Sequence, residues 1–294
     1  MNPPGSILVA TDYSRDAGFA ASRAVTLAAE LGVDALALLH VVEAPWLGAL
    51  QQWFGLADAS RQGLVAEAER SMAGLVAAIE AERGRRPAAS VVVGSLLETV
   101  IEHAAGVDLL VIGARGQHPV RDFAVGTTGE RLLRKRRGAV LVVRGAADGP
   151  YRRVLAPVDF SKHAAHVLEQ AASIAPAAQV DALHAFEVPF EGKLRFAGVP
   201  DDEIHRLRQY ARSQAVEGVA KLVTEAGVDS SRVRCRVEHG YAPRVIVDAA
   251  RAGGADLIVI GKHGESIVED LLLGSVTLHV LGEARCDVLV VSAR

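Results

Sequence analysis

Cysteine, aromatic residues and excess charge are all scarce in this chain of 294 residues. The only two cysteines, Cys235 and Cys286, lie in the second half, which argues against a disulfide framework and fits a reducing compartment. Aromatic residues make up 4% of the chain and hydrophobic residues 50%, so a core of Ala, Val, Leu and Ile is expected. Such a core favours a packed α/β fold over an all-β fold. The net charge of −3 provides no long-range attraction toward nucleic acid or anionic lipid.

Long hydrophobic runs are also missing. No apolar run approaches the ~18 residues that would span a bilayer. The first residues, MNPPGSILVATD, do not combine a basic region with an apolar one, as a signal peptide does. We therefore expect a soluble, cytoplasmic protein with neither a membrane nor a nucleic acid as partner.

The chain repeats itself at a period of about 147 residues. Three segments return in the second half: Ile7–Ser14 as Val154–Ser161, Ala37–Pro45 as Asp181–Pro189, and Val140–Val143 as Val288–Val291. Within each half, five short apolar runs alternate with stretches long enough for helices. This alternation predicts a doubly wound, five-stranded parallel sheet with helices on both faces.

A short stretch rich in Gly, Ala and Asp, 145–151, joins the two halves. It predicts one domain over residues 1–146 and a second over 151–294. Each half is long enough to bury roughly 70% of its unfolded surface without a metal or a disulfide. We expect the two halves to pack as a pseudo-twofold pair, and a further homodimer is an alternative.

Glycines recur at fixed spacing after the fourth predicted strand of each half, Leu109–Ile112 and Leu257–Ile260. The two sets are Gly113, Gly116 and Gly126 followed by Thr127, and Gly261, Gly264 and Gly274 followed by Ser275. Glycine at a strand end permits a positive φ and lets a ligand approach the backbone. Glycine before a hydroxyl residue at a helix start leaves N–H donors suited to phosphate. The loop lacks the lysine of a phosphate-binding Walker motif and the spacing of a dinucleotide fingerprint. The alternative is that each strand–turn–helix unit simply favours glycine at its turns.

Asp12 and Asp159 end the first strand of each half, before the N-cap candidates Ser14 and Ser161. Such a carboxylate could accept from an adenine amino group or a ribose hydroxyl, or help to hold a cation. The alternative is turn chemistry, because Asp is favoured where a strand gives way to a helix.

His40 and His184 recur near the end of the second strand, where a hydrogen-bonded wall is expected rather than a catalyst. The neighbouring Val41 and Ala185 would offer backbone groups that read a base edge.

Together these residues resemble the universal stress protein (UspA) family, in its tandem form with two domains in one chain. The family's ATP-binding signature, G-x2-G-x9-G-[ST], is matched in both halves, and its strand-one Asp matches Asp12 and Asp159. The resemblance implies two Rossmann-like (adenine nucleotide alpha hydrolase-like) domains that bind ATP, with ADP or AMP as alternatives and Mg²⁺ as an optional companion. It implies adenine near the first two strands, and ribose and phosphates along the glycine loop. The implied binding residues are Asp12, Val41, Ile112, Gly113, Gly116, Gly126, Thr127, Thr128, Asp159, Ala185, Ile260, Gly261, Gly264, Gly274, Ser275 and Val276.

The two halves depart from each other in ways that argue against equal affinity. The family's Pro two residues before the Asp is kept as Pro157 but replaced by Ala10, and Phe186 is bulkier than its counterpart Val42. The two loops, 117–125 and 265–273, also differ in character.

The resemblance favours a nucleotide-responsive stress or signalling regulator, with an unidentified protein partner, over a dedicated enzyme. A slow ATPase or phosphotransferase is the alternative, and a ligand-free interaction protein is a third. Phosphoryl transfer needs charge stabilisation at the γ-phosphate, and Arg115 opposite Lys262 is the one basic pair that could supply it. No catalytic residue and no metal site is assigned.

Three other features of the sequence are not part of the predicted site. The basic run 131–137 is expected to be a solvated helix end, with nucleic-acid binding as the alternative. The apolar connections 44–56 and 189–199 are expected to pack as lead-ins to the next helix, with a lid or docking surface as the alternative. His163 and His166 are similar to the HxGH motif of nucleotidyltransferases, but lack its glycine and have no counterpart in the first half.

Overall fold

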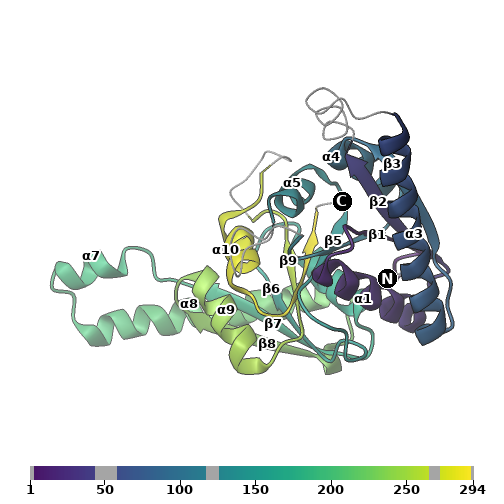
Figure 1. Cartoon of the computed structure of the whole chain (residues 1–294). Coiled ribbons are helices and arrows are strands. Elements are labelled where there is room, and N and C mark those ends of the chain that lie inside the picture. Colours follow the sequence, from purple (N-terminus) through teal and green to yellow (C-terminus); the bar gives the residue numbers. More distant parts are fainter. Residues whose placement is uncertain (1–2, 44–57, 117–125, 265–271, 293–294) are drawn as a thin grey trace. The chain divides into compact units, whose positions relative to one another are not determined.

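The computed structural model describes residues 3–43, 58–116, 126–264 and 272–292 (Figure 1). The connection 44–56, the loop 117–125 and most of the loop 265–273 lie outside these residues. The chain divides into two compact units, Asn2–Pro150 and Tyr151–Arg294, called here the N-terminal and C-terminal units. Each is described by itself.

The N-terminal unit is a five-stranded sheet in the order β3-β2-β1-β4-β5, in which every pairing is parallel. Its elements are β1 (Ser6–Ala10), α1 (Arg15–Leu31), β2 (Ala35–Glu43), α3 (Asp58–Arg83), β3 (Ala88–Gly94), α4 (Leu96–Ala104), β4 (Leu109–Gly113), α5 (Thr127–Lys135) and β5 (Ala139–Val143).

The C-terminal unit repeats this plan in the order β8-β7-β6-β9-β10, again all parallel. Its elements are β6 (Arg153–Pro157), α6 (Ala164–Ile174), β7 (Gln179–Phe186), α7 (Glu191–Phe196), α8 (Asp201–Glu225), η1 (Ser230–Arg232), β8 (Val233–His239), α9 (Ala242–Gly253), β9 (Leu257–Gly261), α10 (Ser275–Glu283) and β10 (Asp287–Val291). The predicted fold class is confirmed.

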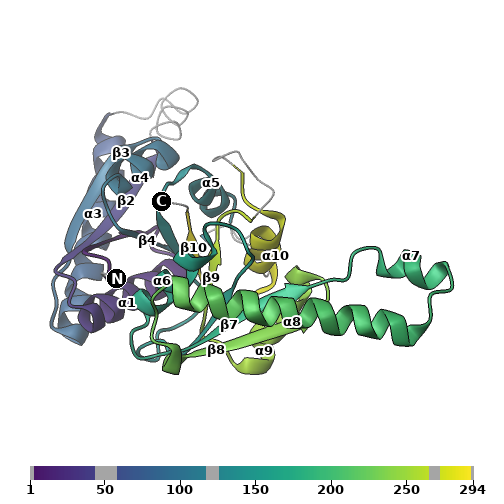
Figure 2. The same cartoon turned by 180° about the vertical axis from the view of Figure 1, so that it is seen from behind.

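Helices cover both faces of each sheet, which explains why the central strands are apolar along their whole length. Leu109–Ile112 and Leu257–Ile260 are buried at every position. Figure 1 shows α9 and α10 in front of the sheet of the C-terminal unit, and Figure 2, from behind, shows α6 and α8. In the N-terminal unit α1 contacts α3, and α4 contacts α5. Right-handed crossovers place these two pairs on opposite faces.

Helix α7 and the start of α8 extend away from the sheet of their unit (Figures 1 and 2). The expectation that 189–199 packs as an apolar lead-in is wrong for its two aromatic side chains, because Phe190 is 71% exposed and Phe196 96%. Polar contacts hold this segment instead. Glu191 accepts hydrogen bonds from Arg208 Nε at 2.9 Å and from His239 Nε2 at 3.1 Å. Among the described residues no helix has the length and apolar character of a membrane span.

Part of the basic run 131–137 is structural rather than solvated. Arg136 follows α5 and is only 4% exposed. Its guanidinium donates to the carbonyl oxygens of Ala104 and Val107, both at 2.6 Å, where α4 ends. Burial lowers the pKa of this guanidinium, and the charge of Asp108 opposes the shift. The expectation of a solvated helix end is therefore wrong at this residue, because its cation binds the carbonyl of Ala104, the last residue of α4, and that of Val107 just beyond it.

Replacing Arg136 with Met should lower the free energy of unfolding of the N-terminal unit by roughly 2–3 kcal/mol, because one buried and one partly buried carbonyl lose a charged donor. Urea denaturation followed by circular dichroism measures the change. Arg134→Met is the matched control: Arg134 pairs with Glu130 at 2.7 Å on the same helix and is more exposed. It should cost no more than about 0.5 kcal/mol. Equal losses in the two variants would contradict the assignment.

Candidate functional site

The predicted site residues of each half follow two neighbouring parallel strands. β1 and β4 pair in register at Ala10 and Ile112, and β6 pairs with β9 in the same way. Because the carboxyl ends of parallel strands lie at one edge of the sheet, the turn after the Asp meets the glycine loop. A Cβ added to Gly116 would lie 2.8 Å from Asp12 Oδ2, and one added to Gly264 would lie 2.9 Å from Asp159 Oδ2. The structure thus brings the aspartate and the second glycine together in both units.

The two oxygens of each aspartate have different surroundings. Asp12 Oδ1 accepts from Ser14 N at 3.0 Å, and Asp159 Oδ1 accepts from Ser161 N at 3.1 Å, which is the turn chemistry expected of Asp. Oδ2 faces the second glycine of the loop. Oδ1 therefore has the turn role, and the binding role remains a prediction that concerns Oδ2.

Only one of the two serines caps a helix. Ser14 Oγ accepts from Ala17 N at 3.3 Å and caps α1 as predicted. The prediction for Ser161 is wrong. Its Oγ donates to Asp159 Oδ1 at 2.6 Å, and α6 begins later, at Ala164. Because this hydroxyl is bonded within the Asp turn, it does not cap a helix. Relative to the Asp, α6 starts farther along the chain than α1 does.

The reason given for the first two glycines needs correction. None of the loop glycines has a φ in the left-handed region, so conformational freedom does not explain them. Space does. A Cβ on Gly113 would lie 2.7 Å from the carbonyl carbon of Asp16 and 2.8 Å from Ala17 N, inside the first turn of α1. At Gly113, therefore, the absence of a Cβ lets α1 pack against the end of β4.

The third glycine is different, because the space beside it is open or nearly so. A Cβ on Gly126 would meet no atom of the described residues within 4 Å, and one on Gly274 would make only ordinary contact, 3.4 Å from Lys262 O. Both glycines are N-caps, of α5 and α10, without a side-chain cap. The side chains that follow, Thr127 and Ser275, are exposed, and Thr128 and Val276 come next in each first turn. The N–H donors predicted for an anion are present at both helix starts.

A cavity of about 720 Å³ lies at this edge of the C-terminal unit, within the range of small-molecule sites. All eight residues predicted for the second half line it: Asp159, Ala185, Ile260, Gly261, Gly264, Gly274, Ser275 and Val276. In the N-terminal unit Val41 and Ile112 are buried at the ends of β2 and β4.

The recurring histidines form the expected hydrogen-bonded wall. His40 Nδ1 lies 2.8 Å from Thr11 O and His184 Nδ1 2.9 Å from Val158 O. A carbonyl oxygen only accepts, so Nδ1 carries a proton in both rings. Each ring also lies against the aromatic residue after the Asp, with centroids 4.3 Å apart for Tyr13 and 4.2 Å apart for Phe160.

Those aromatic residues tie the Asp turn to the long helix. Tyr13 Oη donates to Ala68 O at 2.8 Å, and burial raises the pKa of Tyr13 to about 12. In the C-terminal unit the Phe160 ring occupies the gap that Gly218 leaves on α8, where a Cβ would lie 2.5 Å from the ring. In each unit the aromatic residue thus attaches the Asp turn to the long helix, α3 or α8.

The proposed pairing of Arg115 with Lys262 is wrong by one residue. Ala114 N donates to Val143 O at 2.8 Å, and Lys262 N donates to Val291 O at 2.7 Å, so Lys262 corresponds to Ala114. Arg115 corresponds to His263. The two loops therefore present different cations, because the basic residue is displaced along the chain.

Sequence patterns missed the apolar wall of the cavity and one hydroxyl. Leu183, Ile246 and Val291 line it from β7, α9 and β10. Thr277 Oγ1 donates to Gly261 O at 2.7 Å and joins α10 to the end of β9. A hydroxyl three residues after the third glycine was the available signal for Thr277.

The family profile described as the universal stress protein family matches residues 5–144 and 150–292. The chain belongs to this family. Relatives of this universal stress protein match about half of the chain over most of their own length. A universal stress protein of Methanocaldococcus jannaschii is 31% identical over 147 residues, which cover 48% of this chain and 82% of the relative. The universal stress protein A homolog 1 of Coxiella burnetii is 31% identical over 144 residues, 48% of this chain and 96% of the relative.

Solved structures of similar length share the fold over nearly the whole chain. A universal stress protein from Archaeoglobus fulgidus has a TM-score of 0.69 at 19% identity, covering 98% of this chain and 96% of that chain. A Pseudomonas aeruginosa protein of unknown function has a TM-score of 0.64 at 20% identity, covering 98% and 92%.

The contacts of the glycines predict losses of different size when alanine replaces them at two loop positions. Gly113→Ala should lower the free energy of unfolding by roughly 1–3 kcal/mol, because its Cβ meets backbone atoms of α1. Gly126→Ala should cost less than about 1 kcal/mol, because its Cβ enters open space. Urea denaturation of the two variants beside the parent tests this. A larger loss in Gly126→Ala would show that the first glycine is not the one required by packing.

Proposed function

We propose that each unit binds an adenine nucleotide, ATP above all, and that its occupancy regulates this universal stress protein in stress signalling. The base lies at the ends of the first two strands, and the phosphates lie at the start of α5 or α10. The convergence of all eight predicted residues on one cavity in the C-terminal unit carries the proposal. These residues come from four separate segments of the chain, and a common ligand accounts for their lining one cavity.

The phosphate end is supported by the starts of α5 and α10. Gly274 N is engaged by Lys262 O at 3.0 Å, which leaves the next N–H groups of the first turn for an anion. The Ser275 hydroxyl adds a donor at the same place. A helix N-terminus carries partial positive charge, so phosphate oxygens are held by groups that are already oriented.

The base end is supported by the sheet edge. Val41 and Ala185 follow His40 and His184, whose rings are fixed by their hydrogen bonds to carbonyls. The small side chain of Ala185 leaves its backbone accessible from the cavity that it lines. Asp159 Oδ2, which faces the loop, is placed to accept from a ribose hydroxyl or an amino group.

Magnesium, where it accompanies ATP, is brought by the phosphates. Within the described part of the chain, no group of three or more His, Cys, Asp or Glu side chains could hold a metal ion by itself. Mg²⁺ commonly binds through one or two carboxylates together with substrate phosphates, and such an arrangement needs no protein cage. The site's own contribution is to orient and neutralise the phosphate chain.

Gly274→Asp should abolish ATP binding in the C-terminal unit, because a carboxylate placed at the start of α10 repels the phosphates. Gly282→Asp is the matched control, because it places the same carboxylate on the last turn of the same helix, where a Cβ would meet no described atom within 4 Å. Isothermal titration should give two ATP per chain for the parent and for Gly282→Asp, and one for Gly274→Asp. Gly126→Asp should likewise remove the site of the N-terminal unit.

The proposal fails if the parent chain takes up no adenine nucleotide, either when purified or after ATP is added. It also fails if Gly274→Asp binds as many ATP as Gly282→Asp. Phosphate release measured in the same samples separates binding from hydrolysis, since steady turnover lost in the Gly274→Asp and Gly126→Asp variants would assign catalysis to these sites.

A further inference from the structure

The cavity of the C-terminal unit is also lined by basic side chains that the predicted residues do not include. Lys162, His163 and His166 line it from the start of α6. Lys262 and His263 line it from the end of β9, whereas Asp159 is the one carboxylate among the lining side chains described. A cavity walled in this way fits a ligand with more negative charge than the start of α10 alone would hold.

The helix geometry brings His163 to the level of the glycine loop. Val167 Cγ2 lies 3.7 Å from the position of a Cβ on Gly261, so this stripe of α6 faces the end of β9. His163 precedes Val167 by four residues and belongs to the same stripe, one turn nearer the loop. Both histidines are half-buried, so their rings lie in the wall rather than in open solvent.

His166 has one ring nitrogen already engaged. Its Nδ1 lies 3.2 Å from Glu169 Oε2. A carboxylate oxygen accepts, so Nδ1 donates, and Nε2 is then an acceptor in the neutral ring and a donor in the protonated ring. This second nitrogen can bind a phosphate oxygen only when the imidazole is charged.

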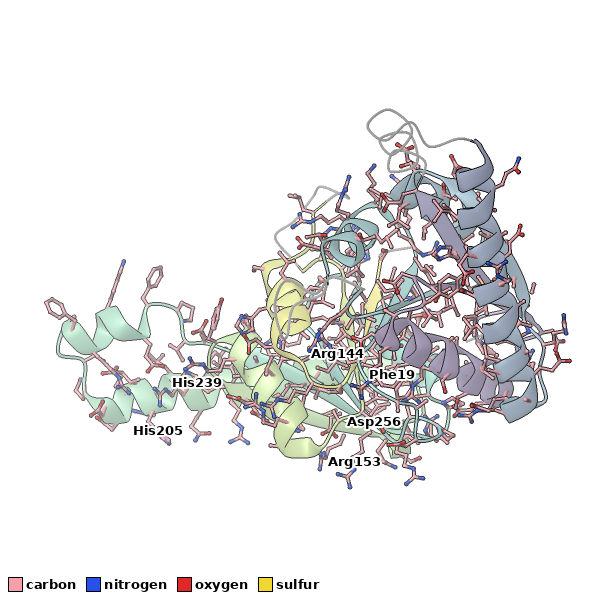
Figure 3. The ribbon with its side chains drawn as sticks, viewed as in Figure 1. Phe19, Arg144, Arg153, His205, His239 and Asp256 are labelled. Atoms are coloured by element: carbon pink, nitrogen blue, oxygen red, sulfur yellow. The ribbon has the colours of Figure 1, made fainter. Side chains whose placement is uncertain are left out.

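Among the described residues, the N-terminal unit has no imidazoles at the positions that correspond to His163 and His166. Asp16 and Phe19 stand where the C-terminal unit has His163 and His166. Arg15 lies over the Phe19 ring, 5.1 Å from its centroid, and Figure 3 labels Phe19 on α1. One unit therefore has a carboxylate and a covered aromatic ring where the other has two imidazoles.

We propose that His163 and His166 form an anion subsite for the phosphate chain of the nucleotide, so that binding of ATP by the C-terminal unit tightens as pH falls. This inference rests on the proposed function, because it assigns the outer phosphates of the same ligand. The residues bind the ligand directly. They also distinguish the two sites, since the N-terminal unit presents Asp16 to the same part of the ligand.

Other charged groups around the subsite support the sign of this effect. Lys162 precedes α6, and Lys262 and His263 follow β9; all three favour an anion. His184 reaches the cavity from β7, and the negative groups are Asp159 after β6 and Glu169 on α6. The buried residues of α8, which contacts α6, are apolar: Ile204, Ala215, Val219, Leu222 and Val223. Protonation gives an imidazole a positive charge, so attraction to phosphate grows on acidification.

The test uses the full chain with Gly126→Asp, which leaves the C-terminal site to be titrated alone. Isothermal titration with ATP and with adenosine is carried out at pH 6 and pH 8. Against this background, His163→Asn with His166→Asn should bind ATP roughly tenfold more weakly at pH 6, since charged hydrogen bonds are lost. At pH 8 the two chains should bind ATP alike, and adenosine should bind alike at both pH values.

Three controls make the result specific. His205→Asn removes a histidine from the part of α8 that extends away from the sheet, as Figure 3 shows, and should change nothing. The terminal phosphate of ATP itself titrates near pH 6, so the comparison is between variants at one pH rather than between pH values. Circular dichroism reports folding, and the single variant His163→Asn, expected to lose part of the effect at pH 6, replaces the pair if the pair is unfolded.

Undiminished ATP affinity at pH 6 in the paired or single variant would overturn the subsite and leave the proposed function intact. So would an equal loss of adenosine affinity, which would mean that the histidines only support the fold. Absence of both ATP and adenosine binding in the parent at either pH would overturn the proposed function together with the subsite.

Discussion

The absence of a side chain at the end of β4 is the constraint on which the N-terminal site depends. Gly113 lets the first turn of α1 approach so closely that a Cβ would lie 2.7 Å from backbone. This approach brings the Asp turn after β1 against the loop after β4, where Gly116 in turn makes room for the Asp12 carboxylate. The parallel pairing of β1 with β4 puts both turns at one edge of the sheet. Without these two glycines the carboxylate and the loop would be held apart.

The C-terminal unit uses the same plan with a looser fit. The neighbours of a Cβ on Gly261 would be His263 O at 3.2 Å and a Val167 methyl at 3.7 Å. α6 starts at Ala164, because Ser161 is bonded to Asp159 instead of capping the helix. The cavity of about 720 Å³ lies beside this delayed helix start. The two units share one topology, but Ser14 caps its helix and Ser161 does not, and the helix next to the site begins at a different point.

Repetition within one chain makes each unit a comparison for the other. The Asp turn, the histidine wall and the aromatic residue between them occur twice, with Tyr13 bonded to α3 and Phe160 packed on α8. The parts that differ are the cations of the glycine loop and the first turn of α1 or α6. Shared features build the turn and the helix start, whereas the differences lie where the charged end of a ligand would be. Two sites of one architecture can in this way differ in the charge that they accept.

Much of the architecture could be predicted because its signals are local. Apolar runs such as Leu109–Ile112, the spacing of Gly113, Gly116 and Gly126, and the Gly-Ser pair before α10 depend on neighbouring residues alone. The α/β class, the starts of α1, α5 and α10, and the residues that converge on the cavity followed from these patterns, whereas the start of α6 did not. The exposure of Phe196 and the burial of Arg136 did not, because both depend on which distant groups pack beside them.

The sequence by itself determined the repeated parallel sheet and the residues at its carboxyl edge, because apolar periodicity and glycine spacing set strand ends without reference to the rest of the chain. Only the tertiary structure decided what fills the space left by each missing Cβ: helix backbone at Gly113, nothing at Gly126. It also decided that His163 and His166 share a cavity with the glycine loop. Those outcomes depend on the distance between residues far apart in the chain, such as Asp16 and Gly113 or His163 and Gly261, and packing sets that distance.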